Sequence, residues 1–165
     1  MEVNAWLIAE IKKRIIEESC SKIIECLELL SNQEINHQFS DNTLSISQSI
    51  VHLNGNVRQW LLGHIIGISY KRERSQEFKT KNTSKDDLLN LINELTQDLE
   101  LYLDRLSELN LGEKISIQSI EGTVFSACIH VIEHFSYHTG QIAFITKLLT
   151  KKDLGFYNNL PGLND

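Results

Sequence analysis

The sequence predicts an all-α protein that forms a single domain, a four-helix bundle. The 165 residues contain one proline and eight glycines, which is little helix-breaking punctuation for a protein of many strands. Apolar residues recur every three or four positions along several long stretches, as they do in amphipathic helices. Because each such helix must bury its apolar face, the helices are expected to pack against one another over residues 1–165.

The first two helices are predicted from their apolar stripes. The first covers roughly the first thirty residues, with a stripe between Ile8 and Leu30. Residues 32–43 are polar and predict a loop with at most one short turn. The second helix begins at Ser45, which together with Gln48 matches a capping box, and its stripe extends to Ile68.

The second half of the chain predicts two further helices. Ser84 is a suitable cap for the third helix, whose regular stripe ends at Leu106. Residues 114–118 alternate between polar and apolar types and predict a short extended piece. The fourth helix is expected over about residues 122–151, and an irregular tail follows from about residue 153.

The composition argues against nucleic-acid and membrane partners. Sixteen lysines and arginines against twenty-two acidic residues give a net charge of −6. A nucleic-acid-binding protein would be expected to have an excess of basic residues. The densest basic run, residues 71–74, includes a glutamate and predicts a solvated helix end. The chain shows neither a signal-peptide pattern nor an apolar stretch of the ~20 residues that cross a bilayer.

Cys20, Cys26 and Cys128 do not form a paired framework, so we expect reduced thiols in a cytoplasmic protein.

Histidines are the residues that suggest chemistry. His130, His134 and His138 follow one another at intervals of four residues in the predicted fourth helix. Neighbours at this spacing lie one turn apart, so two imidazoles can hold one metal ion. The alternative is that they are surface or hydrogen-bonded core histidines. The metalloprotease pattern HExxH is absent, because Phe135 occupies the position of its glutamate.

The second helix offers His52 or His64 as a third ligand. His64 lies in the predicted apolar stripe, and His52 lies on its polar flank. If the second and fourth helices run parallel, the distance of each histidine from the start of its helix can be compared at 1.5 Å per residue. This comparison does not discriminate between His52 and His64. The spacing alone therefore leaves the third ligand open.

Residues 45–56 and 134–142 contain a recognisable pattern, whose most specific element is His-x3-His directly before Gly140 and Gln141. This pattern resembles the DinB/YfiT-like superfamily of metalloenzymes, in particular a bacterial branch of unknown function. The resemblance extends from the first helix to about Tyr157. It implies a four-helix bundle, often dimeric, that holds zinc or nickel on one histidine of the second helix and two of the fourth.

Matched position by position, the resemblance implies three metal ligands: His52, His134 and His138. His130 falls outside this triad and is expected to line the pocket, while His64 is interpreted as structural. Asn56 and Gln141 are candidates to hold the second nitrogens of the ligating imidazoles. Many relatives carry an arginine where this chain has Thr139, so a cation is expected to be missing near the site.

The resemblance implies a metal-dependent enzyme, with thiol S-transfer from a low-molecular-weight thiol such as bacillithiol or mycothiol as the leading chemistry. Metal-dependent hydrolysis is the alternative reaction. A non-catalytic, metal-stabilised, stress-related bundle and a scaffold without metal are alternatives of another class. The partners expected are a small thiol or another small-molecule substrate.

We also expect a homodimer, because the superfamily is often dimeric and apolar residues extend beyond a single stripe. These residues are Trp6, Leu7, Leu62, Ile65, Ile66 and Leu89. The substrate pocket should be lined by the second and fourth helices, with Phe135 and Tyr137 on other faces. The tail around Phe156 and Tyr157 either covers the mouth of this pocket or is disordered.

Overall fold

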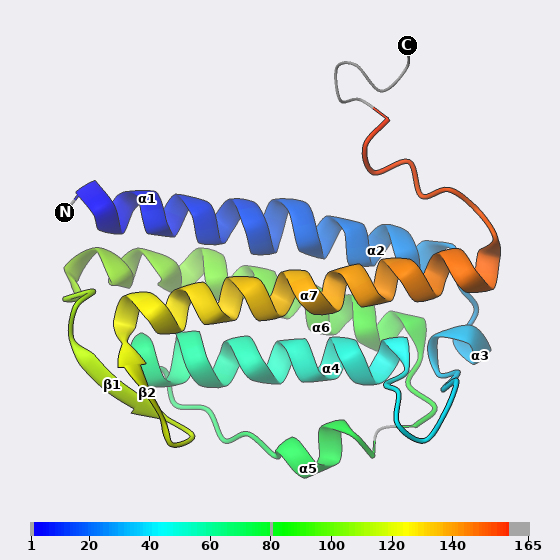
Figure 1. Cartoon of the computed structure of the whole chain (residues 1–165), viewed down its shortest axis with the longest axis horizontal. Coiled ribbons are helices and arrows are strands. Elements are labelled where there is room, and N and C mark those ends of the chain that lie inside the picture. The colour runs from blue at the N-terminus through cyan, green and yellow to red at the C-terminus, as the bar shows by residue number, and fades with distance from the viewer. Residues whose placement is uncertain (1, 80, 159–165) are drawn as a thin grey trace.

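Long helical segments make up most of the computed structural model, which describes residues 2–79 and 81–158 (Figure 1). In chain order they are α1 (Glu2–Ile11) with π-helical η1 (Lys12–Cys20) and α2 (Ser21–Glu28), α4 (Ile46–Val57) with π-helical η2 (Arg58–Ile65), α6 (Lys85–Tyr102) with 3-10 helix η3 (Leu103–Glu108), and α7 (Val124–Thr150). Short elements connect them: α3 (Asn32–Ile35), α5 (Arg74–Glu77), β1 (Lys114–Ile117) and β2 (Ile120–Thr123). The predicted predominance of helix is confirmed, and a small two-stranded sheet is added to it.

The core lies between these long segments and receives apolar side chains from each of them. Examples are Ile15, Leu61, Leu95 and Val131, none of which is more than 2% exposed. The predicted apolar stripes therefore face a shared interior, which holds the segments that carry the histidines at fixed positions.

The predicted start of the second helix is confirmed at Ser45. The Ser45 Oγ accepts a hydrogen bond from the Gln48 N–H at 3.2 Å, and the Gln48 Oε1 accepts one from the Ser45 N–H at 3.0 Å. Ser84 and Asp87 form the same reciprocal pair at the start of α6. These caps satisfy N–H groups that have no partner within the helix.

The α4 and α7 helices lie side by side and run in opposite directions (Figure 1). His52, near the start of α4, contacts His138, with 5.1 Å between ring centroids. Trp60, further along the same segment, contacts His130, which comes earlier in α7, at 4.4 Å. The second and fourth predicted helices are therefore antiparallel, and the parallel arrangement considered above is wrong.

The predicted extended piece at residues 114–118 is β1, which pairs with β2 in an antiparallel hairpin. The two turn residues, Gln118 and Ser119, both have positive φ angles, of 54° and 65°. Such angles characterise the type I′ turn of a two-residue hairpin loop. The second strand was not predicted, because Gln-Ser is not among the residue pairs that signal this turn.

The three cysteines are buried and unpaired, as expected. Burial raises the pKa of Cys20 to about 11 and that of Cys128 to about 12. Both are therefore protonated at neutral pH, and neither has the depressed pKa of a nucleophilic thiol.

The segment after α7 does not cover the histidines. Residues 151–158 form neither helix nor strand, and the rest of the predicted tail, 159–165, lies outside the described residues. Phe156 and Tyr157 lie against Lys22, whose Nζ is 5.8 and 5.3 Å from their ring centroids. The expectation that they cover the mouth of the pocket is therefore wrong.

Among the described residues, helices that combine the length and apolarity of a membrane span are absent.

Candidate metal centre

Three histidines from two helices come together where α4 lies against α7. His52 is in α4, and His134 and His138 lie one turn apart in α7. One ring nitrogen from each lies within 4.8 Å of the other two, and the Nε2 atoms of His52 and His134 are 2.9 Å apart. This cluster has the residue types and the separation needed to hold one divalent metal ion.

The three imidazoles are neutral at neutral pH. His52 and His138 are buried and His134 is half-buried. Burial, followed by the neighbouring histidines, lowers the pKa of His134 and of His138 to about 4, and burial also lowers the pKa of His52. Neutral imidazoles offer the lone pairs that a metal ion requires.

One ring nitrogen of the cluster lacks a partner. The Nδ1 of His138 is buried and has no hydrogen bond with any described residue. An unpaired buried nitrogen costs about 1–3 kcal/mol, unless a ligand supplies the missing interaction. The donor set and this orphaned atom therefore fit a bound metal ion.

A carboxylate holds His52 in place. The His52 Nδ1–H donates to the Oε2 of Glu77 at 3.0 Å. Arg72 in turn donates to both oxygens of Glu77, from Nε at 2.5 Å and from Nη2 at 2.7 Å. With the proton kept on Nδ1, the His52 lone pair is on Nε2, the atom that faces His134.

Glu77 reaches α4 because a glycine leaves room for it. A Cβ at Gly55 would lie 2.3 Å from the Glu77 Oε1. Such a separation is well inside normal contact distance, so a larger residue here would push the carboxylate away from His52. Gly55 is therefore needed for the contact between Glu77 and His52, although it does not touch the imidazole itself.

Comparison with known proteins identifies the family of the chain. Residues 4–158 match the DUF1572 family, which is described as a protein family of unknown function. The chain belongs to the DUF1572 family. No curated protein and no solved structure matches it.

The DUF1572 chain brings some of the other predicted residues to the triad. His130 is half-buried and stacks on His134, with 5.7 Å between ring centroids, so it is a neighbour outside the triad as expected. Gln141 lies beside His138 and, as a side-chain hydrogen-bond partner, opposes the lowering of the His138 pKa. The Oδ1 of Asn56 is buried without a hydrogen-bond partner among the described residues, so the predicted contact with a ligating imidazole is not seen there.

The interpretation of His64 as part of the apolar stripe is wrong, because its side chain is exposed. A stripe at 3.6 residues per turn includes His64, but His64 lies in π-helical η2, whose wider turns shift the face on which each residue lies.

The predicted solvated helix end at residues 71–74 is confirmed for Lys71, Glu73 and Arg74, which are exposed at the start of α5, but it is wrong for Arg72. The preceding helical segment ends at Ile65, and the Arg72 side chain is only 3% exposed because it pairs with Glu77. Its guanidinium also lies 3.2 Å from the Nδ1 of His52. A cation therefore does lie beside the histidines, although Thr139 only donates to the Phe135 carbonyl within α7.

Proposed function

We propose that this protein is a DinB-like four-helix bundle that binds one zinc or nickel ion through His52, His134 and His138 and catalyses thiol S-transfer. The observation that carries the proposal is the meeting of three neutral imidazoles, with one orphaned nitrogen, between the second and fourth long helical segments. These are the segments from which the superfamily draws its ligands. The lengthwise contacts between α4, α6 and α7 and the first segment support a bundle.

The ion would supply acidity at its open coordination position, where it lowers the pKa of a bound thiol or water. The protein supplies the arrangement of the ligands. Glu77, fixed by Arg72, keeps the His52 proton on Nδ1, and Gln141 holds His138.

The transfer itself needs two substrates, a low-molecular-weight thiol and an electrophile with a leaving group. The thiol loses its proton to solvent, and its sulfur attacks the electrophilic carbon. A carbon–sulfur bond forms while the bond to the leaving group breaks, and the leaving group departs with the bonding electrons. Oxidants and reductants are not consumed.

Metal analysis of purified variants tests the site. We expect about one ion per chain in the wild type and little in His134→Ala, because two imidazoles bind an ion less tightly than three. His64→Ala is the matched control, since His64 is exposed and outside the triad. Undiminished metal in a folded His134→Ala variant would rule out the site.

A cobalt-substituted protein tests the chemistry. We expect millimolar thiol to change its visible spectrum, because an open coordination position accepts a thiolate. An unchanged spectrum removes the transferase proposal. A response only to carboxylic acids or esters would favour hydrolysis, and a fully coordinated ion would favour a structural metal.

A further inference from the structure

A groove on the outer side of α7 reaches the candidate metal centre. Its volume is about 570 Å³, and it lies between α7 and the loop of residues 39–44. This volume is within the range of about 300–1,000 Å³ that small-molecule sites occupy. Most of its wall is apolar: Phe39, Leu44, Tyr137, Phe144, Ile145 and Leu148.

The exposure of the lining residues shows how the groove is oriented. Phe144 is 62% exposed and Tyr137 is 64% exposed, so the apolar wall faces solvent. His138 is only 7% exposed, so the groove ends at a member of the histidine triad. Tyr137, which was expected on another face, lines this groove together with His138.

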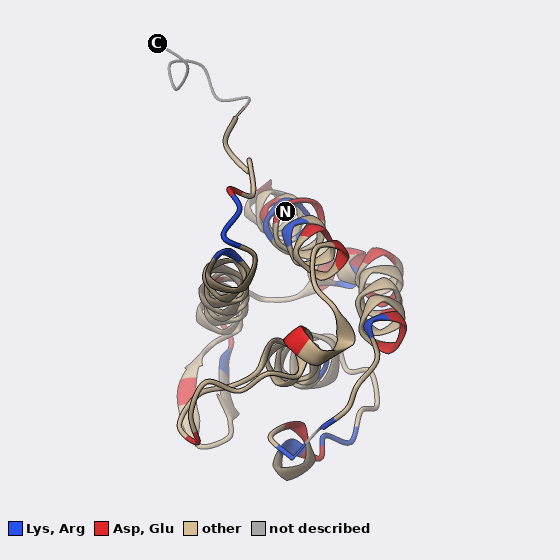
Figure 2. Cartoon of the chain, turned by 90° about the vertical axis from the view of Figure 1, so that its right-hand side faces the viewer, with Lys and Arg blue, Asp and Glu red and all other residues tan. Residues whose placement is uncertain are grey.

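The chemistry of the wall selects an uncharged ligand. Among the described residues that line the groove, none is a lysine, arginine, aspartate or glutamate. Apart from His138, the polar residues of the groove, such as Ser49 and Asn42, carry hydroxyl or amide groups. Figure 2 shows the same contrast, with charged residues gathered on the first helical segment (α1, η1 and α2) and on α6, and few on α7.

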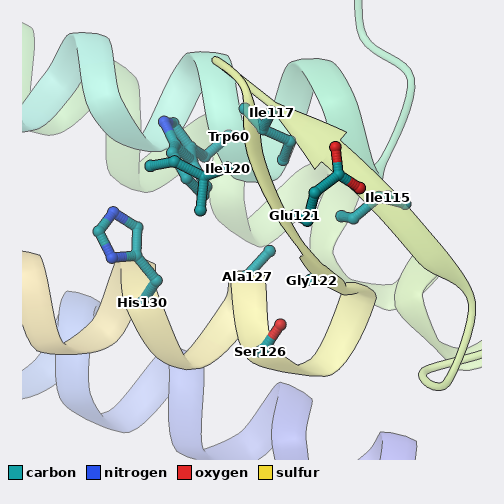
Figure 3. Close-up of a pocket in the computed structure, with 9 residues that line it drawn as sticks. All are labelled: Trp60, Ile115, Ile117, Ile120, Glu121, Gly122, Ser126, Ala127 and His130. Atoms are coloured by element: carbon teal, nitrogen blue, oxygen red, sulfur yellow. The ribbon is translucent and has the colours of Figure 1, made fainter.

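A second cavity near the histidines is less suitable. It lies beneath the β-hairpin, where Trp60, Ile117 and Ile120 line it (Figure 3). Its volume is about 190 Å³, below the usual range for a small-molecule site. The histidine that lines it is His130, which is outside the triad.

We infer that the groove along α7 binds the apolar, uncharged body of a small-molecule substrate whose metal-binding end lies at His138. From His138 to Leu148 the helix rises about 15 Å, which accommodates a chain of several methylene groups. The inference rests on the proposed metal site and adds the substrate class: an aliphatic or aromatic molecule with one donor or reacting group at its end.

Aliphatic hydroxamic acids of increasing length test the inference, because their head group binds metal whether the enzyme is a transferase or a hydrolase. Acetohydroxamic, butanohydroxamic, hexanohydroxamic and octanohydroxamic acid are titrated into the cobalt-substituted protein, and the visible spectrum reports binding. We expect affinity to rise about two- to fourfold per methylene, since each buried methylene contributes about 0.8 kcal/mol.

Variants locate the apolar contact. Phe144→Ala and Leu148→Ala should flatten the dependence on chain length and leave the affinity for acetohydroxamic acid unchanged. Both side chains are more than half exposed, so their removal does not threaten the core. Phe125→Ala is the matched control, because Phe125 is an exposed aromatic residue of the same helix outside the groove, and it should retain the full dependence.

The outcomes separate the two proposals. Equal affinity along the series in a protein that holds cobalt overturns the groove and leaves the metal site intact. A protein that holds no metal overturns both. A wild-type dimer that Phe144→Ala converts to a monomer assigns the groove to a second copy of the chain, which also overturns its role in substrate binding.

Discussion

At the scale of single residues, His52 depends on the buried ion pair of Arg72 and Glu77. Both side chains are at most 7% exposed, so neither charge is solvated and each needs the other. The pair fixes the carboxylate that accepts the His52 Nδ1–H. Orientation of a ligating imidazole by a carboxylate generally raises its basicity toward the metal.

We therefore predict that Glu77→Gln lowers metal affinity about 10- to 100-fold, as expected when the group that orients a ligand is lost. The amide has nearly the same shape but leaves the Arg72 charge unpaired. Competition with a metal-chelating dye measures the affinity. Glu73→Gln is the control, because Glu73 is an exposed glutamate of the same segment. Equal affinities for both variants would show that Glu77 does not act through His52.

The three histidines of the candidate metal centre could be predicted from the sequence. The carboxylate of Glu77, which orients His52, could not. A spacing of four residues is visible in the chain, and the resemblance selected His52 over His64. Glu77 is 25 residues from His52 in an aperiodic segment, where composition does not indicate a contact. Gly55, a glycine inside a predicted helix, was the remaining signal, since it marks a close approach by another group.

At the scale of elements, the start of α4 positions both the helix that carries His52 and the segment that carries Glu77. The capping box joins Ser45 to Gln48, and the Gln48 Nε2 donates to the Phe78 carbonyl at 2.8 Å. Phe78 follows Glu77 directly, so the same cap that starts the helix of His52 also holds the segment that carries the carboxylate.

Ser45→Ala is predicted to lower the free energy of unfolding by about 1 kcal/mol, within the 0.5–2 kcal/mol range for lost N-caps. The hydroxyl accepts the Gln48 N–H, and alanine cannot replace it. Urea unfolding followed by circular dichroism measures the change. Ser69→Ala, at an exposed position outside the helices, should leave the midpoint unchanged. A similar midpoint for wild type and Ser45→Ala would contradict the role of the cap.

Periodicity predicted the long helices well and failed at His64 and in the β-hairpin. Stripes at 3.6 residues per turn located the buried faces of α4, α6 and α7. In η2 the π-helical turns shifted the pattern, so that His64 became exposed. In the hairpin, Gln118 and Ser119 adopt positive φ angles. Asparagine or glycine at these positions would have predicted the turn from the sequence.

At the scale of the whole molecule, the apolar residues that suggested a homodimer divide into two groups. Leu7, Leu62, Ile65 and Ile66 are buried within the chain, and Leu89 is half-buried against the core, so these five do not require a partner. Trp6 is 60% exposed and remains as the reason to expect one.

We predict a homodimer in which Trp6 is buried, with a mass near twice 18.9 kDa by light scattering. Trp6→Glu should give a monomer, because a buried unpaired charge is costly. Leu29→Glu is the control, as it changes an exposed apolar residue at the other end of the same helical segment. An 18.9 kDa species for the wild type at tens of micromolar would reject the dimer.

Metal binding should stabilise the whole fold, because the proposed ligands His52 and His134 are 82 residues apart and converge only in the folded chain. An ion at about 100 times its dissociation constant adds about 2.7 kcal/mol to the free energy of unfolding. In a domain of this size each kcal/mol raises Tm by about 2–4 °C, so chelation should lower Tm by about 5–11 °C. Calorimetry before and after chelation, with metal content measured in parallel, gives the shift, and added metal should reverse it. His134→Ala should melt at one temperature in both conditions. An unchanged Tm in wild-type protein that has lost its ion would mean that the three histidines are not joined through a metal.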